Sequence, residues 1–197
     1  MAAELLRVHE YLDPVDKGLS AKAKILGEQI SAGIHKHATF EHSVFGRVFA
    51  YEVDGYGSRT FMDDASPPSL LSLPYLGFIE QDDMLYQNTR RMVLSRQGNP
   101  YFLEGKQLKG QGSPHIDLKT MWPIGTIAQI ITTNDDEEIK ELLAILKRST
   151  AGLGLIHEGV DVNDTTKFLR TWYAWGNSAF AEMIIDLAER KPHLLFV

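Results

Sequence analysis

Two stretches of the sequence place carboxylates where they could do acid–base chemistry. Asp63 and Asp64 are neighbours in a turn-rich segment, and an apolar run follows them directly. Glu158 has a similar setting, because the glycine-punctuated loop over residues 151–159 is otherwise largely apolar. A carboxylate beside so much apolar surface costs free energy unless a ligand, a metal ion or hydrogen bonds use it. The structural alternative for the first pair is that Asp63 or Asp64 caps a following helix.

Further charged and imidazole groups recur in the loops expected between helices, and aromatic rings alternate with them. The polar set is Arg59, His115, Asp117 and His157, and the aromatic set is Tyr56, Tyr75, Tyr101, Phe102, Trp122 and Trp175. Flat rings stack on the C–H face of a sugar, while carboxylates accept hydrogen bonds from its hydroxyls and transfer protons. The combination is typical of a carbohydrate site.

Each of these groups also has a structural alternative. Glu158 could simply anchor its loop, and His115 could cap the loop that leads to Trp122. Trp172 and Trp175 have helical spacing, which favours core packing for at least one of them.

Metal and phosphate chemistry have little support in the sequence. His35, His37 and His42 lie close together, but positions i and i+2 do not share a helix face, which favours solvated histidines. The three carboxylates above offer oxygen ligands for Ca²⁺, yet they lack the EF-hand spacing. The sequence also has no glycine-rich phosphate loop, no Gly-x-Ser-x-Gly and no His-Glu-x-x-His motif. We therefore expect neither a metal ion nor a cofactor.

The loops that carry these groups must be positioned mainly by helices. Apolar periodicity and capping residues predict helices over residues 3–12, 16–37, 69–76, 82–95, 123–133, 134–150 and 168–190. Residues 38–56 predict a short strand or β-hairpin, and residues 96–120 predict a long ordered loop. Paired helices joined by long loops predict an all-α fold of stacked αα-hairpins, either a solenoid or an α/α toroid.

Composition and charge exclude several classes of partner. The 197 residues carry a net charge of −6, which argues against non-specific binding to nucleic acid or to an anionic membrane surface. The absence of cysteine excludes thiolate chemistry and leaves the compartment open. No signal peptide or membrane-spanning run is visible, which weighs toward the cytoplasm without fixing the localisation.

Several segments, taken together and in order, resemble glycoside hydrolase family 125, the exo-acting α-1,6-mannosidases. The matching segments are Ala50–Gly57, Met62–Leu76, Thr89–Arg91, Asn99–Phe102, Gly112–His115, Trp122-Pro123, His157-Glu158 and Trp172–Ser178. The resemblance implies an (α/α)6 toroid and the hydrolysis of terminal α-1,6-linked mannose with inversion. Inversion requires two carboxyl groups about 6.5–9.5 Å apart, with a water molecule between one of them and the sugar.

The resemblance also assigns roles to individual residues. Glu158 matches the family's catalytic base. The residues expected to contact the terminal mannose of an α-mannoside are Arg59, Asp63, Asp64, Ser113, His115, His157, Trp122 and Trp175, the two tryptophans as walls. Gly159 stands where the family commonly has serine, which we expect to loosen the loop around the base.

One departure bears on activity. The family's general acid lies in a Ser-Gly-Phe-Arg-Pro-Ser-Asp-Asp motif that this sequence does not contain. We therefore expect residues 1–197 to form the C-terminal part of a toroid catalytic domain, with the N-terminal half as its partner. The alternatives are a truncated or non-catalytic carbohydrate-binding homologue, a substitute acid at Asp63 or Asp64, and a helical-repeat interaction protein without sugar affinity.

Overall fold

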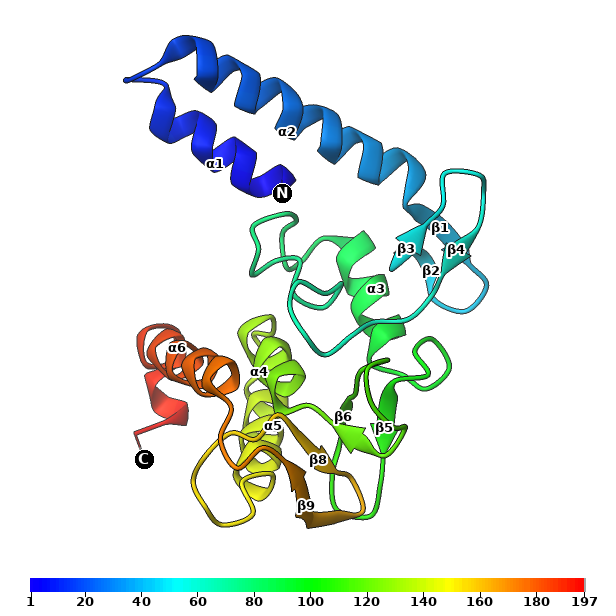
Figure 1. Cartoon of the computed structure of the whole chain (residues 1–197), viewed down its shortest axis with the longest axis vertical. Coiled ribbons are helices and arrows are strands. Elements are labelled where there is room, and N and C mark those ends of the chain that lie inside the picture. The colour runs from blue at the N-terminus through cyan, green and yellow to red at the C-terminus, as the bar shows by residue number, and fades with distance from the viewer. Residues whose placement is uncertain (197) are drawn as a thin grey trace.

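The N-terminal part of the chain is a helical hairpin. The computed structural model describes residues 1–196, and its first two helices are α1 (Ala2–Leu12) and α2 (Lys17–His37). The side chain of Asp16 caps α2 by accepting the N–H of Leu19 at 2.9 Å. Both helices confirm the prediction from periodicity, and the hairpin extends from one end of the molecule, far from α4, α5 and α6 (Figure 1).

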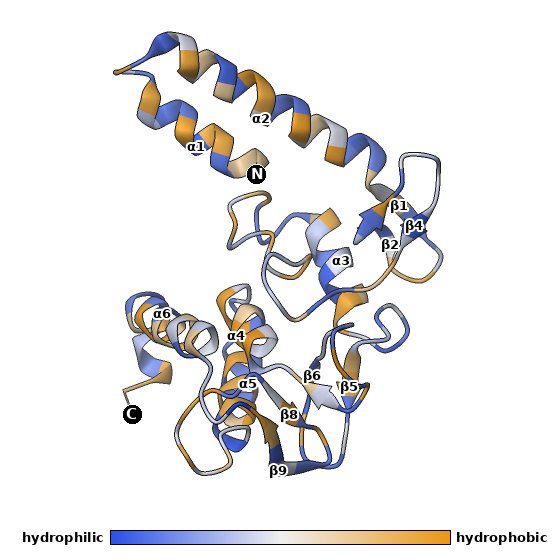
Figure 2. Ribbon diagram, viewed as in Figure 1, coloured by the Kyte–Doolittle hydropathy of each residue, from blue (hydrophilic) through white to orange (hydrophobic). Residues whose placement is uncertain are grey.

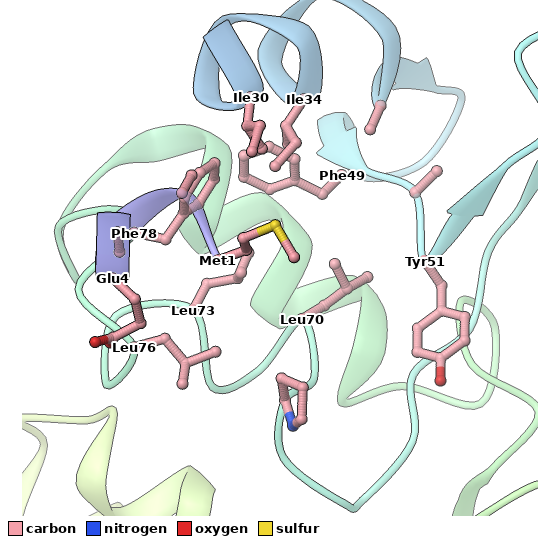
Figure 3. A pocket seen from close by; sticks show the side chains of 15 residues that line it. Met1, Glu4, Ile30, Ile34, Phe49, Tyr51, Leu70, Leu73, Leu76 and Phe78 are labelled. Carbon is pink, nitrogen blue, oxygen red and sulfur yellow. The ribbon is translucent and has the colours of Figure 1, made fainter. Parts of the chain in front are cut away.

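Many large apolar side chains of this hairpin are exposed. Figure 2 shows hydrophobic residues along both helices, and the exposed ones include Val8, Tyr11, Val15, Leu19, Ile25 and Leu26. A cavity of about 530 Å³ separates the start of α1 from the segment Leu70–Phe78. Its lining is almost entirely apolar, with Ile30, Phe49 and Leu73 facing one another (Figure 3). The cavity lacks the polar groups that orient a sugar.

Two small hairpins follow the helices, as the sequence predicts for residues 38–56. Strands β1 (Thr39–His42) and β2 (Gly46–Phe49) pair antiparallel, and β3 (Glu52–Val53) pairs with β4 (Arg59–Thr60). Val48 and Phe49 are buried in a core that they share with Leu71 and Met92.

The predicted helix over residues 69–76 is wrong, because this segment forms consecutive turns. The carboxylate of Asp63 accepts the N–H groups of Leu70 and Leu71 at 2.8 and 3.0 Å. These main-chain donors are thereby fixed by a side chain seven residues upstream. Pro74 has no N–H and cannot extend a helical hydrogen-bond ladder.

The middle of the chain contains a helix and an unpredicted hairpin. Helix α3 (Met84–Val93) begins at Asp83, whose side chain accepts the N–H of Leu85, which confirms the predicted cap. The predicted loop over residues 96–120 contains strands β5 (Phe102–Glu104) and β6 (Lys109–Gln111). The hairpin forms because Leu103 and Leu108 enter the main core, which the many glycines nearby had obscured.

The C-terminal half packs three helices around this core. They are α4 (Pro123–Ile131), α5 (Asp136–Arg148) and α6 (Ala174–Arg190), followed by a short 3-10 helix, Pro192–Leu194. Their buried side chains include Ile127, Ile130, Ile139, Leu142, Ile145, Leu146, Met183 and Leu187.

The predicted start of the last helix near Phe168 is wrong. Residues 164–169 form strand β9 (Asp164–Leu169), which joins β7 (Thr120–Met121) and β8 (Gly159–Asp161) in a three-stranded antiparallel sheet. Phe168 pairs with Val160 and stacks on a buried imidazole, and these contacts outweigh its helical spacing.

The architecture is therefore mostly helical with four small antiparallel sheets, which corrects the all-α expectation. Within residues 1–196, no helix combines the length and the apolar character that a membrane crossing requires.

Candidate active site

Asp63 is fully buried and anchors the main chain. Its oxygens accept the N–H groups of Leu70 and Leu71 and, at 3.0 Å, the side-chain amide of Gln111. Burial raises the pKa of this carboxyl to about 7, and the hydrogen bonds act in the opposite direction. Asp63 thus ties the turns after it to strand β6.

Asp64 belongs to a polar cluster assembled from two distant segments. Its carboxylate accepts hydrogen bonds from the N–H of Ser66 at 3.0 Å and from the hydroxyl of Ser113 at 3.1 Å. Nε2 of His115 lies 3.7 Å from the same carboxylate, and the imidazole is largely exposed. The structure therefore brings together three of the residues that the sequence predicts at the site.

Trp122 lies between this cluster and the loop that carries Glu158. Its side chain packs with Ala65, the neighbour of Asp64, and its ring meets the ring of Tyr173 edge to face at 6.4 Å. A Cβ built on Gly159 would lie 3.4 Å from Cδ1 of Trp122, so the indole touches the opposite loop as well. Trp122 is buried, so its ring packs between the Asp64 cluster and the loop that carries Glu158.

Glu158 is partly exposed and forms an ion pair. Nε of Arg170 lies 3.1 Å from Oε2 of Glu158, and the main-chain N–H of Glu158 donates to the carbonyl of Leu169 at 3.2 Å. Burial, followed by the Glu158 carboxylate, raises the pKa of the nearby Tyr173 phenol above its usual range. The phenol therefore keeps its proton at neutral pH and can donate a hydrogen bond.

His157 is fully buried behind Glu158. Its ring nitrogens Nδ1 and Nε2 each lie 3.2 Å from a carbonyl oxygen, those of Arg170 and Thr150 respectively. The ring stacks on Phe168 with centroids 3.9 Å apart. The imidazole thus fastens the loop before β8 to the end of β9.

Gly159 does not loosen this loop, contrary to the sequence-based expectation. It is buried within β8, and a Cβ at this position would lie 2.6 Å from Cγ2 of Thr120. The glycine is needed because strand β7 approaches too closely for a side chain.

An open, aromatic depression of about 620 Å³ lies beside the Glu158 ion pair. Its lining is formed by one continuous segment, residues 170–175. Trp172 and Trp175 are exposed there, and the ring of Tyr173 lies 6.0 Å from that of Trp175. Core packing, which the spacing favoured for at least one of these tryptophans, is wrong, because α6 begins only at Ala174 and leaves Trp172 in the preceding loop while Trp175 stays exposed.

Arg59 lies apart from these groups, on the exposed hairpin of β3 and β4. Its guanidinium sits over the ring of Phe40 at 4.7 Å and near that of Phe61 at 5.8 Å. His35, one of the three clustered histidines, stacks on Phe78 with centroids 5.5 Å apart. Among residues 1–196, no three His, Asp or Glu side chains gather closely enough to hold a metal ion.

Sequence reasoning missed Arg170, Gln111 and Tyr173 as members of the site. Tyr173 lay within a segment that carried the family resemblance, so the signal was present. The contact of Gln111 joins it to Asp63, 48 residues away, and that of Arg170 depends on the pairing of β8 with β9, and the residues themselves give no pattern for either.

The comparison with known proteins identifies the class. The chain matches the family of metal-independent α-mannosidases, GH125, over residues 1–185, and it belongs to that family. This confirms the resemblance and extends it to the N-terminal hairpin.

Two relatives are close in sequence. The Meiotically up-regulated gene 157 protein of Schizosaccharomyces pombe is 54% identical over 196 residues, covering 99% of this chain and 38% of that protein. A Streptococcus pneumoniae member of the metal-independent α-mannosidases, solved in a non-productive complex with α-1,6-mannobiose, is 38% identical with a TM-score of 0.91. The match covers 96% of this chain and 46% of that one. The chain therefore spans less than half the length of either relative.

Proposed function

We propose that this chain forms the C-terminal part of an inverting exo-α-1,6-mannosidase and contributes the catalytic base, Glu158. The observation that carries the proposal is the setting of Glu158. It is a partly exposed carboxylate, fixed by an ion pair beside an aromatic depression of about 620 Å³. Membership of the α-mannosidase family and the α-1,6-mannobiose bound by the bacterial relative support mannose as the terminal sugar.

In the proposed mechanism, the Glu158 carboxylate removes a proton from a water molecule. The water oxygen attacks the anomeric carbon on the face opposite the leaving oxygen, which inverts the configuration. The leaving oxygen must be protonated by a second carboxyl group at the same time. We assign that acid to the part of the toroid outside this sequence, since the family's acid motif does not occur here.

The polar cluster supplies hydrogen bonds to the sugar. Asp64 is buried and already accepts hydrogen bonds from Ser66 and Ser113, so the exposed imidazole of His115 is the member of this cluster that can reach a sugar. Trp175 offers an exposed ring for stacking. Trp122, buried between the two sides, sets their separation.

Two of the sequence-predicted contact residues act from behind the site in this proposal. Asp63 and His157 are fully buried, so they position Asp64 and Glu158 respectively. Arg59 stays a candidate for the outer rim only, because its guanidinium already rests on Phe40.

We further propose that the α1–α2 hairpin packs against the remaining half of the toroid. Its exposed apolar side chains support this, since contiguous apolar surface of that kind usually marks an interaction site. The match covers 46% of the bacterial relative, so the rest of that relative is long enough to correspond to the other half of a toroid.

Hydrolysis of α-1,6-mannobiose by this chain, combined with the half of the toroid that carries the acid, tests the proposal. Changing Glu158→Gln should lower turnover at least 100-fold, as expected for loss of a general base. The matched control is Glu104→Gln, an exposed acid on β5, which should leave turnover unchanged. Binding without turnover by the unaltered chain, with the acid-bearing half of the toroid present, would refute hydrolysis and favour a carbohydrate-binding homologue. Absence of binding would refute the sugar site altogether.

A further inference from the structure

Arg170 adopts a backbone conformation that its side chain disfavours. Its φ is +48°, and Ala151, with φ +49°, is the other non-glycine residue in this region among residues 1–196. L-residues avoid the left-handed region because Cβ crowds the backbone. Such residues persist only where the surrounding structure holds them, and they concentrate at functional sites.

The buried ring of His157 holds both of these turns. One ring nitrogen lies 3.2 Å from the carbonyl oxygen of Arg170, and the other lies 3.2 Å from that of Thr150, directly before Ala151. Stacking on Phe168 fixes the plane of the ring. A buried side chain that adjoins Glu158 in sequence therefore supports the main chain at Arg170.

The enforced turn directs the guanidinium to the carboxylate. Arg170 follows the last residue of β9, and Leu169 is paired with Gly159 in β8. Arg170 and Glu158 are therefore held close together by the pairing of β8 with β9. Nε of Arg170 reaches Oε2 of Glu158 at 3.1 Å, and Oε1 is left for other partners.

We propose that Arg170 is a positioning residue that fixes the Glu158 carboxylate for catalysis. By binding Oε2 it restricts the rotation of the carboxylate, so that Oε1 is the atom that meets the attacking water. A displacement of about 1 Å in such a group can cost about 100-fold in rate. The inference rests on the proposed role of Glu158 as base, and it adds how that base is oriented.

Two variants of Arg170 separate the effect of its positive charge from the effect of its backbone conformation. Arg170→Asn removes the guanidinium while easing the backbone, because asparagine tolerates the left-handed region better than arginine. Arg170→Lys keeps a positive charge at the same position. Lys167→Asn is the matched control, since Lys167 is exposed on β9 and pairs with Asp164.

Steady-state kinetics on α-1,6-mannobiose, with the acid-bearing half of the toroid present, give the first readout. Arg170→Asn should lower kcat at least tenfold with KM within about twofold, Arg170→Lys should recover part of the loss, and Lys167→Asn should match the unaltered chain. A raised KM with unchanged kcat would overturn the proposal and make Arg170 a substrate-binding residue. Unchanged kcat and KM would also overturn it.

Crystal structures of the same variants give a readout independent of turnover. The Glu158 carboxylate should occupy one position in the unaltered chain and two or more in Arg170→Asn. An unmoved, single Glu158 in Arg170→Asn would refute the positioning role even if the chain hydrolyses mannobiose. If the unaltered chain shows no turnover, the proposed activity fails while the Glu158 conformers still decide the role of Arg170.

Discussion

Asp63 makes the free energy of unfolding depend on pH in a predictable direction. Burial raises its pKa from 3.8 to about 7 in the folded chain, so the folded state holds the proton more tightly than the unfolded state does. Stability from this group is fully present below pH 3.8 and is lost as the pH rises toward 7. The rise of about 3 pH units corresponds to about 4 kcal/mol, of which about 2–3 kcal/mol falls between pH 5 and pH 7.5.

The change Asp63→Asn isolates this contribution. Asparagine places an NH₂ group against at least one of three donors, which costs about 1–3 kcal/mol at any pH, but it does not titrate. Urea unfolding at pH 5, 6, 7 and 7.5 should therefore show the stability difference between the unaltered chain and the variant shrinking by about 2–3 kcal/mol as the pH rises.

A matched change at an exposed carboxylate, Asp82→Asn, controls for the general effect of removing a charge. A constant difference for Asp63→Asn would refute the reasoning. It would mean that the three hydrogen bonds outweigh burial and keep Asp63 ionised across this range.

Two further predictions concern a close contact at Gly159 and the ion pair between Arg90 on α3 and Glu138 on α5. Gly159→Ser should destabilise the chain by about 1–3 kcal/mol in thermal or urea unfolding, because its Cβ meets the Thr120 methyl. Adding Thr120→Ser, which removes that methyl and keeps the hydroxyl, should restore most of the loss; no restoration would contradict the clash. Glu138→Ala should cost about 1–3 kcal/mol, because it removes the acceptor shared by Arg90, Gln129 and Thr133 in a partly buried network. A cost near zero would show that solvent replaces the carboxylate.

The helices were the most predictable part of the fold. Their signals are local: the apolar spacing along α2 and the capping side chains of Asp83 and Asp135 act within one or two turns. The strands β5, β6 and β9 were missed because each depends on its pairing with the neighbouring strand of a hairpin and on packing against the core. Glycine-rich or polar residues there resemble a loop, or a helix start, until that partner is in place.

The sequence predicted which residues belong to the candidate site better than it predicted what each residue does there. Asp64, Ser113 and His115 do come together, and Glu158 is partly exposed beside aromatic rings. The burial of Asp63 could not be read from its sequence, because it depends on which main-chain donors fold over it. Its contacts are with the main chain of Leu70 and Leu71, and the helix that the capping alternative required does not form there.

The stereochemistry of the first product tests the central proposal most directly. The measurement is a ¹H NMR time course of α-1,6-mannobiose with this chain combined with the acid-bearing half of the toroid, recorded before the released mannose can mutarotate. Glu158 acting as a base on water predicts that β-mannose appears first. The appearance of α-mannose first would contradict the account, because it would require a covalent intermediate in place of a water-activating base.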